Sequence, residues 1–414
     1  AKENGVETGV LELSTFDGGL RGMKARKAIE SGQDLIAVPE SLVVRIIGDS
    51  PTYPSKTLQD VVSRDVWKQL PWYAQLALLL IAEQHKVAVG EECQRDEWVK
   101  ALPKSLPTPL HWADDQLMDI KYQGIVNSVR TQKSKWRSLH ASIKSSSSRP
   151  PSESEFFHAC ELARSRAFSG DYTAPLPKEQ FFLLGLLIAC SEQFNLMPGG
   201  TAFFGGALVV AALFGQSLIL PKILGIKHYV ISPYIDMINH DTKEASEVTY
   251  APFQKSFVVV ASKGYQRDKQ VYISYGTRSN DQLLQYYGFV EKDNPNDVYQ
   301  ITDLTAAVKQ FLPDVSTDQV ILEREKGEGG PVSFFTPKGL DAETTRVITA
   351  LCGGDSGKAS ALIQDIAKEE RDKMKSVVAA GGSDKGKTAK EKEAEAMMKT
   401  FAEEKVKLLD NVIG

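Results

Sequence analysis

Cysteine is scarce in this chain of 414 residues. The four cysteines, Cys93, Cys160, Cys190 and Cys352, show no Cys-x-x-Cys or Cys-x-x-His spacing. This distribution argues against a disulfide framework and against a structural zinc site. We therefore expect a protein of a reducing compartment that needs no metal to fold.

An excess of basic residues is also missing. The chain has 49 lysines and arginines against 53 aspartates and glutamates, which gives a net charge of −4. A protein that binds nucleic acids generally carries a basic face, so we expect no direct nucleic-acid binding. The hydrophobic fraction of 42% is typical of globular proteins, and the length predicts about two to three domains.

Charged residues are absent from one internal stretch, between Glu192 and Lys222. Residues 201–220 are close in number to the ~20 apolar residues that a membrane-spanning helix requires. Three interpretations of the apolar insert at residues 180–224 remain open. It could enter or dock on a membrane, form buried core helices, or bind a large protein assembly.

Hydrophobic periodicity predicts an α+β chain. Residues 9–42 read as a strand, a glycine turn from Asp17 to Gly22, and further strands. Residues 65–145 have helical spacing, and a serine-rich linker precedes another helix that ends near Phe168. Lys390 to Val412 forms an amphipathic helix whose apolar stripe we expect to pack in a core.

Two polar segments follow strand-like runs between Tyr229 and Val290. The first contains Asn239 and His240, and the second starts at Tyr275. The other five histidines show no ligand spacing to His240, and no glycine-flanked serine or cysteine suggests a nucleophile. Taken alone, the Asn-His pair is most simply a structural feature. The aromatic residues after Tyr275 suit a slot for an amine or a sulfonium, held by cation–π and C–H···O contacts.

The order of the motifs resembles that of the SET-domain methyltransferases. The similarity is carried by four segments: Gly22 with Ala25, Ser165 to Phe168, Asp236 to His240, and Tyr275-Gly276 through Tyr287-Gly288-Phe289-Val290. The branch that the chain resembles is the Rubisco large-subunit lysine methyltransferase group. The chain departs from the family pattern in two places. Leu20 stands where the first glycine of a Gly-x-Gly turn is usual, and an apolar insert from Phe181 to Leu224 lies between the Arg166 and Asn239 segments, where the better-known members are short.

The resemblance implies a fold and its boundaries. We expect a SET-domain β-fold of small sheets with a pseudoknot, in which the segment of Tyr275 passes beneath the Asn-His segment. The implied parts are 1–60 (start of the SET domain), 61–160 (inserted helical segment), 161–300 (SET core with the apolar insert) and 301–414. The last is expected to be an all-α substrate-binding domain.

The resemblance also implies residue roles. S-adenosylmethionine would be bound by Gly22, Met23, Arg166, Asn239, His240 and Phe289. Tyr275 would be catalytic, and Tyr250 and Tyr287 would line the channel for the substrate lysine. No metal would take part.

The implied activity is methyl transfer from S-adenosylmethionine to a lysine of a protein substrate in the chloroplast, either in the stroma or at the thylakoid. Two alternatives stay open. One is a weak or inactive SET-fold subunit that is docked by residues 180–224 into a membrane or a plastid assembly. The other is methylation of a histidine side chain.

Overall fold

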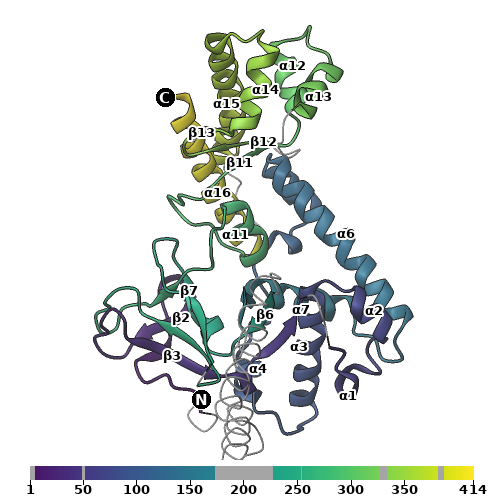
Figure 1. The fold of residues 1–414 in the computed structure, drawn as a ribbon, viewed down its shortest axis with the longest axis vertical. Helices are drawn as coiled ribbons and strands as arrows, with labels where there is room; N and C mark the ends of the chain where they lie inside the picture. The colour runs from purple at the N-terminus through teal and green to yellow at the C-terminus, as the bar shows by residue number, and fades with distance from the viewer. Residues whose placement is uncertain (1–4, 49–51, 173–226, 253, 327–332, 381–386) are drawn as a thin grey trace, which may run out of the picture. The chain divides into compact units, whose positions relative to one another are not determined.

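The computed structural model describes residues 5–48, 52–172, 227–252, 254–326, 333–380 and 387–414. They form two compact units, each assembled from two separate parts of the chain (Figure 1). Unit 1 comprises Ala1–Leu102 and Leu139–Tyr275, and unit 2 comprises Pro103–Ser138 and Gly276–Gly414. The apolar insert at residues 180–224 lies outside the described residues.

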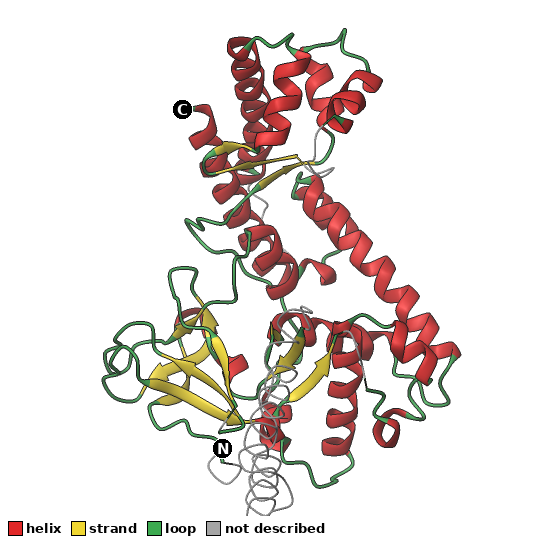
Figure 2. Cartoon of the chain, in the orientation of Figure 1, coloured by secondary structure: helices red, strands yellow, loops and turns green. Residues whose placement is uncertain are grey.

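Unit 1 contains small sheets, as the resemblance implies (Figure 2). Three of them are antiparallel: β1 (Leu11–Thr15) with β2 (Arg21–Ala25); β3 (Asp34–Pro39), β9 (Ser256–Val260) and β8 (Val248–Ala251); and β4 (Val44–Ile47), β6 (His228–Ile231) and β5 (Phe168–Gly170). A further pair, β7 (Asn239–His240) and β10 (Tyr272–Ile273), is parallel.

The turn between β1 and β2 follows the glycine pattern of the sequence. The 3₁₀ helix η2 (Asp17–Gly19) occupies it, and Gly19 has a φ of +80°, a value that favours glycine. The Phe16 N–H donates to the Leu20 carbonyl at 2.8 Å, which closes the turn. The predicted strand–turn–strand is therefore confirmed.

Helix α3 connects the helices of unit 1 to the third sheet. They are α1 (Ser55–Leu58), α2 (Arg64–Gln69), α3 (Trp72–Ala88), α4 (Asp96–Ala101) and α7 (Glu153–Arg166). Helix α7 begins at the end of the serine-rich linker because Ser152 and Glu155 form a capping box. The ring of Trp72 stacks on Tyr229 of β6 at a centroid distance of 4.5 Å, and this contact ties α3 to the sheet. Helix α6 (Gln123–Ser145) contributes residues to both units.

Unit 2 is mainly helical. Its further helices are α5 (Asp114–Asp119), α11 (Asn280–Tyr287), α12 (Leu304–Phe311), α13 (Thr317–Glu325), α14 (Ala342–Leu351), α15 (Ser356–Ala379) and α16 (Ala389–Ile413). The helical C-terminal region is thus as expected, but it is not purely α. Strands β11 (Tyr299–Ile301), β12 (Ser333–Thr336) and β13 (Gly339–Leu340) form an antiparallel sheet there. Strands this short leave no alternating pattern long enough to recognise in a sequence.

The apolar stripe predicted on the last helix is buried in α16. Met398, Phe401 and Leu408 are all at most 6% exposed, which confirms the expectation of core packing. Lys405 lies on the same stripe and is also fully buried. None of the helices in the described parts of the chain is both long and apolar enough to cross a membrane.

Candidate functional site

Two side-chain amides lie close against Gly22 of β2. A Cβ atom at this position would stand 2.5 Å from Asn239 Nδ2 and 2.8 Å from Gln270 Nε2. Real Cβ contacts are not that short, so any side chain at Gly22 would displace both amides. The Asn239 amide meanwhile donates to the Arg21 carbonyl at 3.0 Å. The glycine motif is therefore in contact with the Asn-His motif, although more than two hundred residues separate them.

The Asn-His segment is held by its parallel pairing with β10. Asn239 faces Tyr272 and His240 faces Ile273 in the register, and the Asp241 N–H donates to the Ile273 carbonyl at 3.3 Å. A parallel contact between these segments is what the expected pseudoknot requires. It brings the end of β10, and with it Tyr275, to the imidazole of His240.

Three contacts fix Tyr275 against the Asn-His segment. Its ring stacks on His240 at a centroid distance of 4.9 Å and an interplanar angle of 17°. Its N–H donates to His240 Nδ1 at 3.0 Å, and its hydroxyl donates to the Ile238 carbonyl at 2.9 Å. Because Nδ1 accepts this bond, the proton of the neutral imidazole is assigned to Nε2, which lies 3.2 Å from Thr242 Oγ1.

The turn that precedes Asn239 is strained and is fixed from two helices. Tyr234 has a φ of +69°, which is unusual for a bulky residue, and the 3₁₀ helix η6 (Ile235–Met237) follows it. The Asp236 carboxylate inside η6 accepts two bonds of 3.1 Å from Trp98 Nε1 of α4. It also accepts a bond of 2.8 Å from Arg166 Nη1 at the end of α7.

Arg166 therefore has a protein partner within unit 1. Its Nη1 also donates to the Asp236 carbonyl at 3.0 Å, and its side chain is 18% exposed. Burial raises the pKa of Asp236, while Arg166 and the Trp98 indole oppose that shift. The role implied for Arg166, holding a cofactor carboxylate, has to be compatible with this ion pair.

Two buried nitrogen donors near these motifs have no hydrogen-bond partner: Arg166 Nε and Gln270 Nε2. Such atoms are uncommon in folded proteins and need an explanation. The Gln270 side chain is held through its oxygen, which accepts a bond of 2.9 Å from the Tyr272 hydroxyl. A ligand that brings acceptor atoms would satisfy such donors. These two donors fit the carboxylate and other acceptors of S-adenosylmethionine.

Two other site residues of unit 1 have different surroundings. Met23 is 3% exposed and packs in the core, and its carbonyl accepts a bond of 2.9 Å from the Val271 N–H. Tyr250 of β8 donates from its hydroxyl to Glu40 Oε2 at 2.6 Å. Burial and this hydrogen bond raise the pKa of Tyr250, so the phenol stays protonated.

Tyr287 and Phe289 belong to unit 2. Tyr287 is the last residue of α11, and its ring meets Phe289 edge-on at a centroid distance of 6.2 Å. Gly288 between them ends the helix with a φ of +75°, and a Cβ there would stand 3.0 Å from Pro107. Glycine is thus required for the two aromatic rings to adopt this arrangement. Their assignment to the channel and the cofactor wall stays a prediction.

Sequence reasoning missed three residues of the site in unit 1. They are Trp98, Gln270 and Asp236, whose carboxylate anchors the turn before Asn239. The sequence indicated no role for any of them. Trp98 lies 138 residues from Asp236 in the chain, so no local spacing connects them. Within the described residues, no group of three or more His, Cys, Asp or Glu is arranged to hold a metal ion.

The chain is similar in sequence to SET-domain proteins, although no protein-family model matches it. It is 21% identical over 306 residues to SET domain-containing protein 4 of Artemia parthenogenetica, which covers 73% of this chain and 64% of that protein. It is 31% identical over 117 residues to the ribosomal lysine N-methyltransferase set10 of Schizosaccharomyces pombe (28% and 21% of the two chains). Over 100 residues it is 31% identical to the actin-histidine N-methyltransferase of Drosophila melanogaster (23% and 18%). The chain thus spans less than two thirds of each of these relatives.

Solved structures show the fold. The structure of Rubisco LSMT bound to AdoMet matches with a TM-score of 0.57 at 17% identity, over 100% of this chain and 88% of that one. The SET domain of LSMT bound to lysine and AdoHcy matches with a TM-score of 0.57 at 16% identity and the same coverage. The fold is therefore that of the LSMT SET domain with a helical C-terminal region, and the expected fold class is confirmed.

Proposed function

We propose that this protein transfers a methyl group from S-adenosylmethionine to a lysine side chain of a protein substrate. One observation carries the proposal: within unit 1, Gly22 lies against Asn239 and Tyr275 lies against the adjacent His240, so three distant segments are brought together. The lysine methyltransferase set10 among its sequence relatives, and LSMT among its fold relatives, support the reaction class.

Each motif residue has a task in this reaction. S-adenosylmethionine supplies an electrophilic methyl group on a sulfonium. The Gly22 backbone and the Asn239 and His240 segment would bind it, and Arg166 Nε would donate a hydrogen bond to its carboxylate. Arg166 can do so while Nη1 keeps Asp236, because a guanidinium has five N–H donors.

Tyr275 would act at the transferring methyl group. Its hydroxyl proton is engaged by the Ile238 carbonyl, so the phenol oxygen can present a lone pair. Oxygen atoms around a polarised methyl group favour it through C–H···O contacts. The stacking on His240 fixes the ring, and fixed geometry is the main contribution that a protein makes to such a displacement.

The substrate lysine must arrive as a neutral amine. The nitrogen lone pair forms the new N–C bond while the S–C bond breaks and its electrons stay on sulfur. An amine with a pKa near ~10.4 in water is mostly protonated at neutral pH. Aromatic walls such as Tyr287 and Phe289 would disfavour the ammonium, so that its proton is released to solvent before attack.

Calorimetric titration with S-adenosylmethionine, followed by transfer of labelled methyl to a lysine-peptide array, tests the proposal. We expect saturable binding and label on lysine. Absence of binding at millimolar cofactor would favour the alternative of an inactive SET-fold subunit.

Histidine methylation is the second candidate, because the chain is locally similar to an actin-histidine N-methyltransferase. Mass spectrometry of the labelled product separates the two, since the modified residue is identified directly. Label found only on histidine would replace the lysine proposal.

We also propose a chloroplast location, supported only by the likeness of the fold to Rubisco LSMT. Docking of residues 180–224 on a membrane or a large assembly is part of the same proposal. Fractionation of plastids followed by carbonate extraction of their membranes tests both. Recovery outside plastids would refute the location, and full release by carbonate would refute membrane insertion.

A further inference from the structure

Helix α16 buries one charged side chain on its apolar stripe. The Lys405 side chain has no exposed surface. Its ammonium lies 4.7 Å from the ring centroid of Phe401 and 5.5 Å from that of Tyr122. Lysine is almost never fully buried unless it is paired, so the partners of this ammonium identify what it does.

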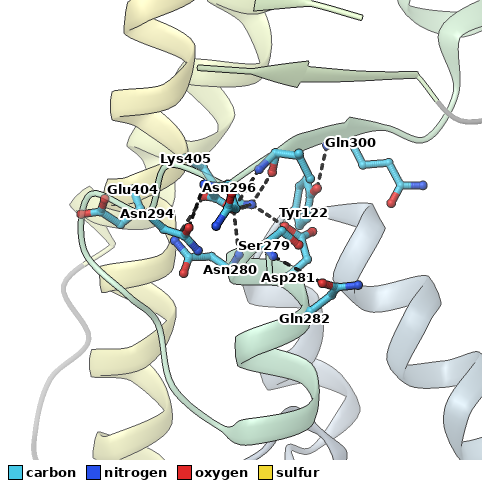
Figure 3. Close-up of polar contacts among 12 residues, drawn as sticks. Tyr122, Ser279, Asn280, Asp281, Gln282, Asn294, Asn296, Gln300, Glu404 and Lys405 are labelled. Atoms are coloured by element: carbon cyan, nitrogen blue, oxygen red, sulfur yellow. Dashed lines mark hydrogen bonds and ion pairs between the residues drawn. The ribbon is translucent and has the colours of Figure 1, made fainter. Parts of the chain in front are cut away.

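The Lys405 ammonium donates to three oxygen atoms (Figure 3). They are Asp281 Oδ2, Asp297 Oδ1 at 2.9 Å, and the Val298 carbonyl. Burial alone lowers the pKa of Lys405, but the two carboxylates outweigh it and the pKa is raised. The group therefore stays charged. It has three N–H bonds and three acceptors, so its hydrogen-bonding capacity is fully used.

Both carboxylates restrain the first turn of α11. Asp281 lies in that turn, and Asp297 accepts from the Asn280 N–H at 2.9 Å and from Asn280 Nδ2 at 3.2 Å. Asn280 in turn exchanges two bonds with the Glu291 main chain, of 3.0 Å and 2.9 Å. The start of α11 and the loop of residues 291–298 are thus joined through one ammonium.

A second set of contacts ties the same loop to α16. The Asp293 N–H donates to Glu404 Oε2 at 2.8 Å, and Lys407 pairs with Asp293 at 3.1 Å. The Asn294 amide donates to the Arg278 carbonyl at 2.9 Å, just before α11. Lys407 is about half exposed, whereas Lys405 is not exposed at all. We therefore assign the main role in holding the start of α11 and the loop to Lys405 and not to Lys407.

We propose that Lys405 is a positioning residue for Tyr287 and Phe289, because it orients the helix that ends at Tyr287 and leads into Phe289. The inference rests on the proposed function, which assigns these two residues to substrate and cofactor binding. Helix α11 has eight residues, a length of about 12 Å, so a tilt of ten degrees at its start would move its end by about 2 Å. Such a displacement would move the two aromatic rings that the proposed function needs in place.

The test measures local order and reaction together. Lys405→Met removes the ammonium and keeps an apolar stem of similar length, and Asp281→Asn loosens α11 while Lys405 keeps Asp297. Lys399→Met on the exposed face of α16 is the matched control. Hydrogen exchange is followed over residues 280–289 and, as an internal reference, over Ala342–Leu351 of α14. Initial rates use S-adenosylmethionine and the array peptide that the wild type methylates fastest.

In Lys405→Met that is folded by circular dichroism, we expect exchange over residues 280–289 to rise at least tenfold and kcat/KM to fall at least tenfold. Asp281→Asn should show smaller changes of the same kind, and Lys399→Met none. If Lys405→Met does not fold, hydrogen exchange and kcat/KM of Asp281→Asn test the inference instead. Unchanged kcat/KM in the folded variant, or equal loss of protection in both segments, would overturn the inference. If the wild type itself transfers no methyl group, the proposed function fails, whereas exchange still decides whether Lys405 holds α11.

Discussion

Each unit buries a cation against a carboxylate, and the two clusters differ in what they leave unsatisfied. In unit 1, Arg166 pairs with Asp236, remains 18% exposed and keeps a buried Nε without an acceptor. In unit 2, Lys405 is completely enclosed and all its donors are used. A buried donor without an acceptor, such as Arg166 Nε, is suited to binding a ligand. A cation whose donors are all hydrogen-bonded, such as Lys405, is suited to holding neighbouring segments in place.

The largest expected effect concerns the cluster of Lys405. Lys405→Met leaves the carboxylates of Asp281 and Asp297 buried without a counter-charge, which should lower the free energy of unfolding by about 4 kcal/mol. Urea denaturation measures it. The double variant Lys405→Met/Asp281→Asn should recover part of the loss, since one of the buried charges is then gone. If the single variant were as stable as the wild type, the ion pairs of Lys405 with Asp281 and Asp297 would not stabilise the fold.

In the cluster of Arg166 and Asp236, the substitution Asp236→Asn should lower the free energy of unfolding somewhat less than Lys405→Met does. We expect a loss of about 3 kcal/mol, because Arg166 keeps some access to water. Unlike Lys405→Met, this change should also weaken binding of S-adenosylmethionine, as seen in a smaller rise of the melting temperature on adding the cofactor. Asp34→Asn, at an exposed carboxylate on β3, is the control and should change neither quantity.

Tyr275→Phe separates reaction from stability. The phenol loses its bond to the Ile238 carbonyl but keeps the stacking on His240, so the protein should fold normally. We expect methyl transfer to fall on the order of 100-fold, comparable to the loss of one preorganised polar group at a reacting centre. Cofactor affinity should change little. Undiminished transfer would remove Tyr275 from the catalytic role.

Gly22→Ala tests whether the glycine motif takes part in cofactor binding, because it adds a single methyl group there. The added carbon would meet the amides of Asn239 and Gln270, so the cofactor affinity measured by calorimetry should fall about tenfold, or about 1.4 kcal/mol. Gly9→Ala is a matched control, because a Cβ there meets nothing within 4 Å. Equal affinities for the two variants would show that the close approach at Gly22 has no part in binding.

The smallest effect is a pH dependence at a buried histidine that stays neutral in the folded protein. Burial, followed by the charge of Arg45, lowers the pKa of His228 to about 4 from 6.5. The unfolded chain then binds the proton more readily, so this contribution to stability is full above pH 6.5 and is lost as the pH falls toward 4. Melting temperatures across that window should fall less steeply in His228→Asn than in the wild type, and equal slopes would contradict this assignment.

Several features of the molecule could be predicted from the sequence because their signals are local. The glycine turn, the helix that ends at Arg166 and the apolar stripe of α16 each depend on residues a few positions apart. The motif order implied that the segments of Gly22, Asn239 and Tyr275 belong to one site, and the structure has Gly22 beside Asn239 and Tyr275 against His240.

The features that could not be predicted depend on contacts between residues that are far apart in the sequence. Arg166 was assigned to a ligand, and nothing near it indicated that Asp236, 70 residues away, would take one of its nitrogens. Lys405 was placed correctly on a buried stripe, but its two carboxylate partners lie more than a hundred residues earlier. The strands of unit 2 were missed because two to four residues carry no readable alternation.

The distance along the chain between Asp281 and Lys405 has a consequence for synthesis. The two residues are 124 positions apart, and at about 5–20 residues per second a ribosome needs roughly 6–25 s to add the second after the first. During that interval helix α11 exists without the ammonium that fixes its start. A nascent chain therefore has the segments of Gly22, Asn239 and Tyr275 complete before the start of α11 is fixed, and residues 280–289 are held in place only after α16 has been made.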